Sequence, residues 1–226
     1  MYNFLLDIPT ILFFLLLAHL AIAVTLAIYL IQSVSRHTSD RRFLLGTLLQ
    51  GVGLYLTSQR GRIPNYYSVN WGNVLIFLGL ALVMRTLITL EKPNKYLDIF
   101  YAIVFGLFVI VFWGTVKNLN QSVIIASAFL AFLYLSSAVL MAIYNIEKSI
   151  LRYSLSLTCA VSGVLMAIRG ISAFNQTNFT LLSKNGIQDA TFIMVFFVVI
   201  LGGTGYLLLL RERSELLLKK ANHELS

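Results

Sequence analysis

A few polar side chains lie within the long apolar runs of this chain, and their chemistry limits what it does. His19 and Gln50 fall near the middle of two runs, and Arg169 lies close to the end of another. An arginine side chain is a permanently charged fork of donors that binds carboxylate and carbonyl oxygens. A charge within a membrane helix costs about 2.5–3.5 kcal/mol. We therefore expect Arg169 either to face other helices or to extend its head group to the interface.

We predict a ligand pocket formed by Arg169, Asn73, Trp71, Gln50 and His19. It would open to the outer side and take an anionic or carbonyl-bearing ligand. Asn73 lies one turn into an apolar run, and Trp71 ends a loop rich in arginine and tyrosine that would cover the pocket. Simpler interpretations remain open. His19 and Gln50 suit hydrogen bonds between helices, and the loop suits the aromatic belt of a membrane interface.

No motif for catalysis or metal binding accompanies these residues. All nine acidic residues lie at the ends of runs, in loops or in the tail, whereas proton relays need carboxylates within the membrane. A retinal protein needs a lysine in its seventh helix, and residues 190–210 contain none. HExxH, GxSxG, a Walker-type loop and a Cys/His cluster are also missing from the sequence. We therefore predict no catalytic residue, no metal ligand and no cofactor, and do not expect this segment alone to be an enzyme.

The composition indicates that nearly all of the chain lies in lipid. Of 226 residues, 58% are hydrophobic and 12% are charged, and the mean hydropathy is +0.84. A soluble domain carries about 25% charged residues, so this chain has too little polar surface for an ordinary soluble enzyme. A spanning helix needs about 20 apolar residues, which leaves room for about seven or eight helices. The runs are continuous rather than alternating, which argues against a transmembrane barrel.

We predict an all-α fold, a polytopic bundle of seven transmembrane helices. The second run is short and rich in glycine, and small residues mark one face of the sixth, so that another helix can approach it closely. Those small residues are Ala160, Gly163, Ala167 and Gly170. The seven runs cover residues 8–32, 43–59, 70–90, 97–116, 122–144, 153–174 and 190–210.

Residues near the ends of the runs give further expectations. Asp7, Asp98 and Asp189 each precede a run, which suits the N-cap of a helix. Arg85 lies near the end of the third run, and we expect it to anchor the helix by reaching the interface. The only cysteine, Cys159, lies in an apolar stretch and suits a packing role.

Lysine and arginine are distributed unequally between the two sides of the predicted bundle. Twelve of the 17 fall on one side and five on the other. Basic residues accumulate in cytoplasmic loops, so we predict an outside N-terminus and a cytoplasmic C-terminus. The net charge of +8 has the same explanation, and no nucleic-acid partner is predicted. The smaller set comprises Arg60, Arg62, Lys117, Arg169 and Lys184.

The seventh run continues into a charged tail without a helix-breaking residue after Gly205. We therefore divide the chain into a transmembrane sensory domain, 1–210, and the start of a cytoplasmic signalling helix or coiled coil, 211–226. The tail carries a plausible seam of a two-stranded coiled coil, although an amphipathic helix lying on the membrane remains an alternative. Because the sequence stops within this helix, an output domain is expected to follow. The seam residues are Leu207, Ser214, Leu218, Ala221 and Leu225.

Three stretches resemble the N-terminal seven-helix sensory region of bacterial membrane-bound diguanylate cyclases that carry a GGDEF output domain. They are Asn73-Val-Leu-Ile-Phe-Leu-Gly-Leu-Ala-Leu, Met166-Ala-Ile-Arg-Gly and the closing Leu210-Arg-Glu-Arg-Ser-Glu-Leu…Ala-Asn-His-Glu-Leu. Seven-helix sensory regions of some histidine kinases have a similar layout and are the second choice. The resemblance implies a homodimer, because a diguanylate cyclase joins two GTP-bound half-sites. The full-length protein is then expected to be a diguanylate cyclase or a histidine kinase.

These features predict a multi-pass sensory domain of the bacterial inner membrane. It would detect an external or membrane-borne ligand, a small molecule or a lipid, and signal through its last helix to a cytoplasmic output domain in the same chain. The lipid bilayer is its other partner. Two alternatives remain: a small-molecule transporter or channel, and a lipid-binding membrane partner protein without signalling.

The charge asymmetry predicts which side of the membrane the C-terminus occupies. A reporter fused after Ser226 should be active when it requires the cytoplasm and inactive when it requires export. Paired fusions of a cytoplasmic and an exported reporter measure this. Activity of the exported reporter alone would contradict the orientation.

Overall fold

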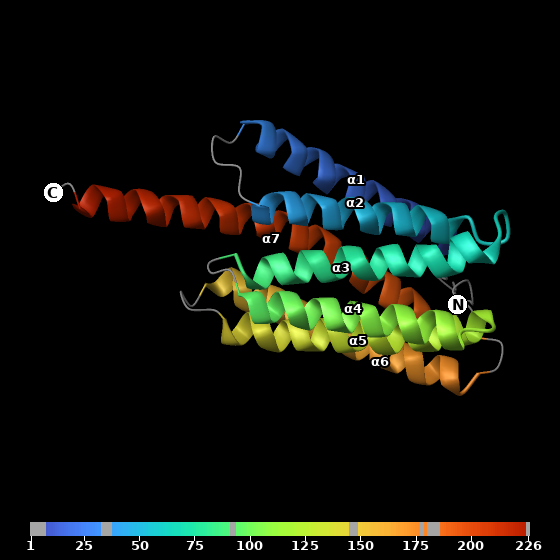
Figure 1. Ribbon diagram of the computed structural model, residues 1–226. Coiled ribbons are helices and arrows are strands. Elements are labelled where there is room, and N and C mark those ends of the chain that lie inside the picture. The colour runs from blue at the N-terminus through green and yellow to red at the C-terminus, as the bar shows by residue number, and fades with distance from the viewer. Residues whose placement is uncertain are drawn as a thin grey trace, which may run out of the picture.

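The structure is a computed structural model whose described helices account for almost the whole chain (Figure 1). Within the described residues the only strand-type pairing is an isolated bridge between Arg60 and Ile63. The prediction of an all-α chain is therefore confirmed. The described residues are 8–32, 38–90, 94–144, 149–176, 179 and 186–224, with the side chains of α7 described up to Glu215 except at 213. The elements are α1 (Ile8–Gln32), α2 (Thr38–Ser58), the π-helix η1 (Tyr66–Trp71), α3 (Gly72–Ile88), α4 (Lys95–Thr115), α5 (Leu119–Ile143), α6 (Ile150–Phe174) and α7 (Gly186–Glu224).

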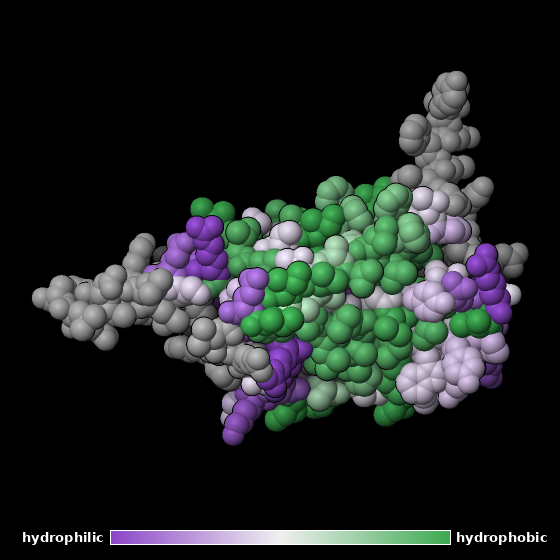
Figure 2. Space-filling model, turned by 90° about the horizontal axis from the view of Figure 1, so that it is seen from above, coloured by the Kyte–Doolittle hydropathy of each residue, from purple (hydrophilic) through white to green (hydrophobic). Residues whose placement is uncertain are grey.

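Six of the described helices are long and apolar enough to cross a membrane. α2 does not meet this criterion by composition, since it begins with Asp40, Arg41 and Arg42 and contains polar and glycine residues. Apolar side chains cover the middle of the surface, and polar ones gather toward its two ends (Figure 2). The chain is therefore a multi-pass membrane protein. The six candidate spans are α1, Tyr66–Ile88, α4, α5, α6 and Gly186–Glu212.

The helices run up and down, and two ends of the bundle can be distinguished (Figure 1). At the end that we call the Arg169 end, α1, α3, α5 and α7 begin. At the opposite end, the Asp40 end, α2, α4 and α6 begin. α3 packs against α2, α4 and α5, whereas α7 packs between α1 and α6. α7 then continues beyond the Asp40 end as a single helix, as predicted from the uninterrupted tail (Figure 1).

Asparagines, and not the predicted aspartates, cap two of the helices. The side chain of Asn94 accepts a hydrogen bond from the backbone N–H of Tyr96 at the start of α4 (2.9 Å). Asn118 does the same for Gln121 at the start of α5 (2.8 Å). Asp98 and Asp189 instead lie in the first turns of α4 and α7. The N-cap prediction for both is wrong, because the helices begin earlier than their apolar runs. Asp7 lies outside the described residues.

Two pairs of glycines bring the backbones of α2 and α3 into direct contact. A Cβ atom on Gly46 would lie 2.7 Å from the carbonyl oxygen of Gly79, and one on Gly53 would lie 2.7 Å from that of Gly72. A Cβ atom on Gly79 would in turn collide with the carbonyl oxygen of Gly46. The glycines are seven residues apart on each helix, so both pairs lie on one seam. Close approach of this kind is how small residues join helices within membranes.

Glycines also admit neighbouring helices into α6 and α7. A Cβ atom on Gly163 would lie 2.6 Å from Cγ of Leu135, which confirms the predicted close approach to α6 and identifies α5 as the partner. On α7, a Cβ atom on Gly203 would lie 2.5 Å from Cδ1 of Ile22 in α1. α7 is therefore fitted closely against its neighbours.

The glycine seam predicts opposite effects of two glycine-to-alanine changes. Gly79→Ala should destabilise the protein by about 1–3 kcal/mol, because the new methyl group must push α2 from α3. The matched control is Gly106→Ala in α4, where a Cβ atom would meet nothing within 4 Å. This control should gain up to about 1 kcal/mol from helix propensity. Unfolding in detergent with increasing SDS measures both, and equal effects would contradict the seam.

Candidate functional site

Arg169 lies buried between three helices at the Arg169 end of the bundle. Its side chain is on α6, and the residue is 4% exposed. Its Nε donates to Oε1 of Gln188 on α7 at 2.7 Å, and its Nη1 donates to Oγ of Ser127 on α5 at 3.2 Å. The guanidinium carbon also lies 5.8 Å from the ring centre of Phe192. Arg169 therefore faces the bundle, and the alternative in which it reaches the interface is wrong.

A second arginine lies at the same end of the bundle. Arg60 follows α2 in the loop toward η1, and its Nε atom is buried without a hydrogen-bond partner among the described residues. Burial lowers the pKa of the Arg60 guanidinium to about 10. Part of the Arg60 side chain is therefore withdrawn from water although its Nε atom has no described partner.

The other two predicted residues of the outer rim serve local structure. Nδ2 of Asn73 donates to the carbonyl oxygen of Val69 at 2.6 Å, one turn earlier in the chain. The Trp71 ring packs edge-on against that of Trp113 on α4, with centres 5.5 Å apart, and against that of Tyr66 at 6.4 Å. These contacts fit the aromatic belt that we considered as the simpler interpretation.

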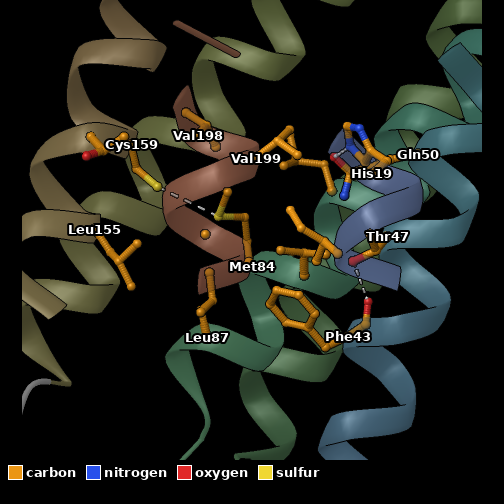
Figure 3. Close-up of a pocket in the computed structure, with 16 residues that line it drawn as sticks. His19, Phe43, Thr47, Gln50, Met84, Leu87, Leu155, Cys159, Val198 and Val199 are labelled. Carbon is orange, nitrogen blue, oxygen red and sulfur yellow. Dashed lines mark hydrogen bonds between the residues drawn. The ribbon is translucent and has the colours of Figure 1, made fainter. Parts of the chain in front are cut away.

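His19 and Gln50, each of which suited a hydrogen bond between helices, lie close to each other near the middle of the bundle. Nε2 of His19 lies 3.5 Å from Oε1 of Gln50, and its Nδ1 lies 2.8 Å from the carbonyl oxygen of Leu15. Both line a cavity that also includes Met84 and Cys159 (Figure 3). Its volume is about 30 Å³, which suits one or two water molecules and not an organic ligand.

The five predicted site residues therefore lie in separate places. Arg169 forms a polar cluster with α5 and α7, Asn73 and Trp71 belong to the start of the α3 region, and His19 and Gln50 lie between α1 and α2. Cys159 is a buried packing residue, as predicted, with its Sγ 3.8 Å from Sδ of Met84.

Two partners of Arg169 were not among the predicted site residues. Gln188 precedes the seventh run and Ser127 lies within the fifth. Gln188 is fully buried although it is polar.

At the Asp40 end, α7 is joined to α2 by a buried polar contact. The hydroxyl of Tyr206 donates to Oδ1 of Asp40 at 2.5 Å, and its ring stacks on that of Phe43 with centres 4.0 Å apart. Tyr206 is fully buried, and Asp40 is 2% exposed. Just beyond, Oγ of Ser149 donates to Glu212 at 3.1 Å. Contacts with α2 and with the start of α6 therefore hold α7 as it leaves the bundle.

Arg85 was expected to anchor its helix by reaching the membrane interface, but the structure places it inside the protein. It is 6% exposed, and both Nε and Nη2 donate to the carboxylate of Asp98 at the start of α4. Nη1 of Arg42 lies 3.9 Å from the same carboxylate. An ion pair between α3 and α4 therefore holds Arg85 inside the protein. The groove beside it has a volume of about 230 Å³ and is lined mainly by apolar residues.

The seam predicted for α7 is described only in part. Leu207 is half-buried against the bundle, and Ser214 is exposed. The helix includes Leu218 and Ala221, whose side chains are not described, and Leu225 lies outside the described residues. The coiled coil stays a prediction.

Comparison with models of known protein families, with curated proteins and with solved structures finds no match to this chain. Within the residues that the structure describes, no group of His, Cys, Asp and Glu side chains is arranged to hold a metal ion.

The buried contact at the Asp40 end predicts the effect of removing one oxygen atom. Tyr206→Phe leaves the carboxylate of Asp40 without this donor and should cost about 1.5–3 kcal/mol, as expected for a hydrogen bond to a charged group. The exposed Tyr153 supplies a matched control, for which Tyr153→Phe should change stability by less than about 0.5 kcal/mol. SDS unfolding of both variants measures the difference. A Tyr206→Phe variant as stable as the control would show that the contact does not hold α7.

Proposed function

We propose that this chain is a membrane sensory domain that passes a signal from the Arg169 end to the Asp40 end through α7. The observation that carries the proposal is the continuity of one helix. α7 holds Gln188 against Arg169, holds Tyr206 against Asp40, and then extends past the bundle. The two contacts lie 18 residues apart, or roughly 27 Å along an α-helix.

In this proposal the ligand binds at the Arg169 end. Arg169, Ser127 and Gln188 join α5, α6 and α7 there, and Arg60 lies in the loop that follows α2 at the same end of the bundle. A ligand that changes how Arg169 holds Gln188 would displace or rotate the start of α7. It shifts the equilibrium only if it binds one arrangement of the helices more tightly than the other.

The proposed topology has seven spans, with α2 as the seventh. α2 contacts α3 at both glycine pairs, so the two helices lie side by side over the same depth. The unequal distribution of lysine and arginine supports an outside Arg169 end and a cytoplasmic Asp40 end. The proposed location is the bacterial inner membrane.

The projecting part of α7 would then enter the cytoplasm and connect to an output domain. From Leu210 to Glu224 it extends by about 20 Å. The resemblance to sensory regions of diguanylate cyclases supports a homodimer with a GGDEF domain as output, and a histidine kinase is the second choice.

Insertions into α7 test whether its register carries the signal. Residues 1–226 are fused to a diguanylate cyclase domain, and short helical insertions are placed after Glu215, where the side chains are exposed. Seven residues restore the seam of a coiled coil, whereas four residues displace it. The seven-residue insertion should keep the cyclic di-GMP output of the parent fusion, and the four-residue insertion should change it severalfold.

Cellular cyclic di-GMP, at equal amounts of membrane-inserted protein, is the measurement. The seven-residue insertion serves as the control for length. Equal output from both insertions and from the parent fusion would contradict transmission through α7.

A further inference from the structure

A groove between α3 and α4 lies beside the ion pair of Arg85 and Asp98, and we call it the Arg85 groove. Its volume is about 230 Å³, whereas pockets that enclose a drug-sized molecule have about 300–1,000 Å³. Lining residues come from 78–85 on α3 and from 98–105 on α4, so the groove follows the helices for roughly 10 Å. A groove of this length and volume suits part of a chain molecule better than a compact one.

The half of the groove nearer the middle of the bundle is apolar. Its walls are Leu78 and Leu82 of α3 with Ala102 and Phe105 of α4, and none of the four is fully buried. The neighbouring surface of α4 is apolar as well, with Ile103 56% exposed. In a membrane this surface contacts lipid tails, so an acyl chain can enter the groove directly from the bilayer.

The other half of the groove carries more positive than negative charge. Arg85 occupies both oxygens of the Asp98 carboxylate, since its Nε donates to Oδ1 and its Nη2 donates to Oδ2 at 2.9 Å. Arg42 of α2 approaches the same carboxylate, with its Nη1 atom 3.9 Å from Oδ1. Two arginines thus share one aspartate, and the charged side chains that line the groove have an excess of one positive charge.

Arg42 has donors that the protein leaves unbound. Its separation of 3.9 Å from Asp98 is an ion-pair distance and is too long for a hydrogen bond. In the part of the chain that the structure describes, the Arg42 side chain forms no hydrogen bond, and it is 40% exposed. Its guanidinium can therefore bind a phosphate at the mouth of the groove without losing a hydrogen bond inside the protein. The planar fork of an arginine matches two phosphate oxygens in parallel.

We propose that the Arg85 groove binds an anionic phospholipid, with its phosphate at Arg42 and one acyl chain between α3 and α4. The proposed orientation places this end at the cytoplasmic leaflet, whose lipids include anionic ones. Basic pockets between membrane helices on that side bind such head groups. The inference goes beyond the proposed function, because this site lies at the end of the bundle opposite Arg169.

Charge favours this lipid over other occupants of the groove. In a symmetric dimer the same surface occurs on both chains, so a second copy packed here would bring two positively charged grooves together. A free phosphate would neutralise the charge but would leave the apolar half unfilled. An anionic phospholipid satisfies both halves, since its head group compensates the excess charge and its tail covers the apolar walls.

Native mass spectrometry of the full chain tests the inference, because it counts both the bound lipids and the protein copies. The chain is purified in an uncharged detergent and titrated with phosphatidylglycerol, with phosphatidylcholine of the same acyl chains, and with glycerol phosphate. We expect saturable binding of phosphatidylglycerol, at least about fivefold tighter than that of phosphatidylcholine, because the latter carries a cation beside its phosphate. Glycerol phosphate lacks the acyl chains and should not bind at the same concentrations.

A charge variant tests the polar half of the groove. Arg42→Gln should weaken the binding of phosphatidylglycerol by at least about fivefold and bring it close to that of phosphatidylcholine. The matched control is Arg41→Gln, which changes the net charge equally at an exposed neighbour that does not line the groove. This control should bind phosphatidylglycerol as the unaltered chain does.

A second variant tests the apolar half without changing the charge. Ala102→Leu places a larger side chain in the path of the acyl chain and should weaken the binding of phosphatidylglycerol severalfold. The same change at Ala142, an exposed alanine of α5 outside the groove, is the matched control and should have no effect. Should Ala102→Leu fail to fold, the Arg42 and Arg41 variants decide the question alone.

Several results would overturn the inference. Equal affinity for phosphatidylglycerol and phosphatidylcholine would remove the role of charge, as would an Arg42→Gln variant that binds like Arg41→Gln. Glycerol phosphate that binds as tightly as the lipid would make this a site for free phosphate. An Ala102→Leu variant that loses dimers and keeps its bound lipid would identify the groove as an interface between copies.

Discussion

The buried guanidinium of Arg169 determines how three helices meet, because a charge removed from water must have its donors satisfied. Ser127 and Gln188 supply acceptors from α5 and α7, so these helices must present polar residues toward α6 at one depth. The start of α7 is therefore tied to a charged side chain and not only to apolar surface. The hydrogen bonds of Arg169 at one end of the bundle therefore affect the position of α7, which leaves the bundle at the other end.

Close backbone packing extends the constraint at Arg169 to the whole of α7. Gly203 fits α7 against α1, and the paired glycines hold α2 and α3 as one unit. Asp40 of α2 then accepts the hydroxyl of Tyr206, which fixes α7 to that unit. Tightly packed interfaces do not deform continuously and instead change between discrete arrangements. A displacement of α7 at Gln188 is therefore expected to move Tyr206 as well.

The sequence predicted the helices well, because apolar runs follow directly from the needs of a helix in lipid. The first run agrees with α1 at both ends, and α7 continues into the tail as expected. The sequence also indicated that His19 and Gln50 suit hydrogen bonds between helices, although it did not identify them as partners of each other.

Tertiary partners were harder to predict from the same sequence. Asp98 was taken for an N-cap, yet it binds Arg85, which is distant in sequence and comes near only through the packing of α3 on α4. The contact of Arg169 with Gln188 depends in the same way on the packing of α6 on α7. The glycine spacing in α2 and α3 was visible, but nothing in it names the partner helix.

The coupling between the two ends of α7 is tested most directly by a distance measurement between spin labels. Labels at Thr38→Cys and Ser214→Cys, both exposed, report the position of α7 relative to α2, in a Cys159→Ala background. Double electron–electron resonance is recorded for the otherwise unaltered chain, for Arg169→Gln and for the exposed control Arg62→Gln. The account predicts that Arg169→Gln shifts the distance by about 1–2 Å or adds a second population, while Arg62→Gln does not. Superimposable distributions for all three would show that the Arg169 end is not coupled to the projecting end of α7.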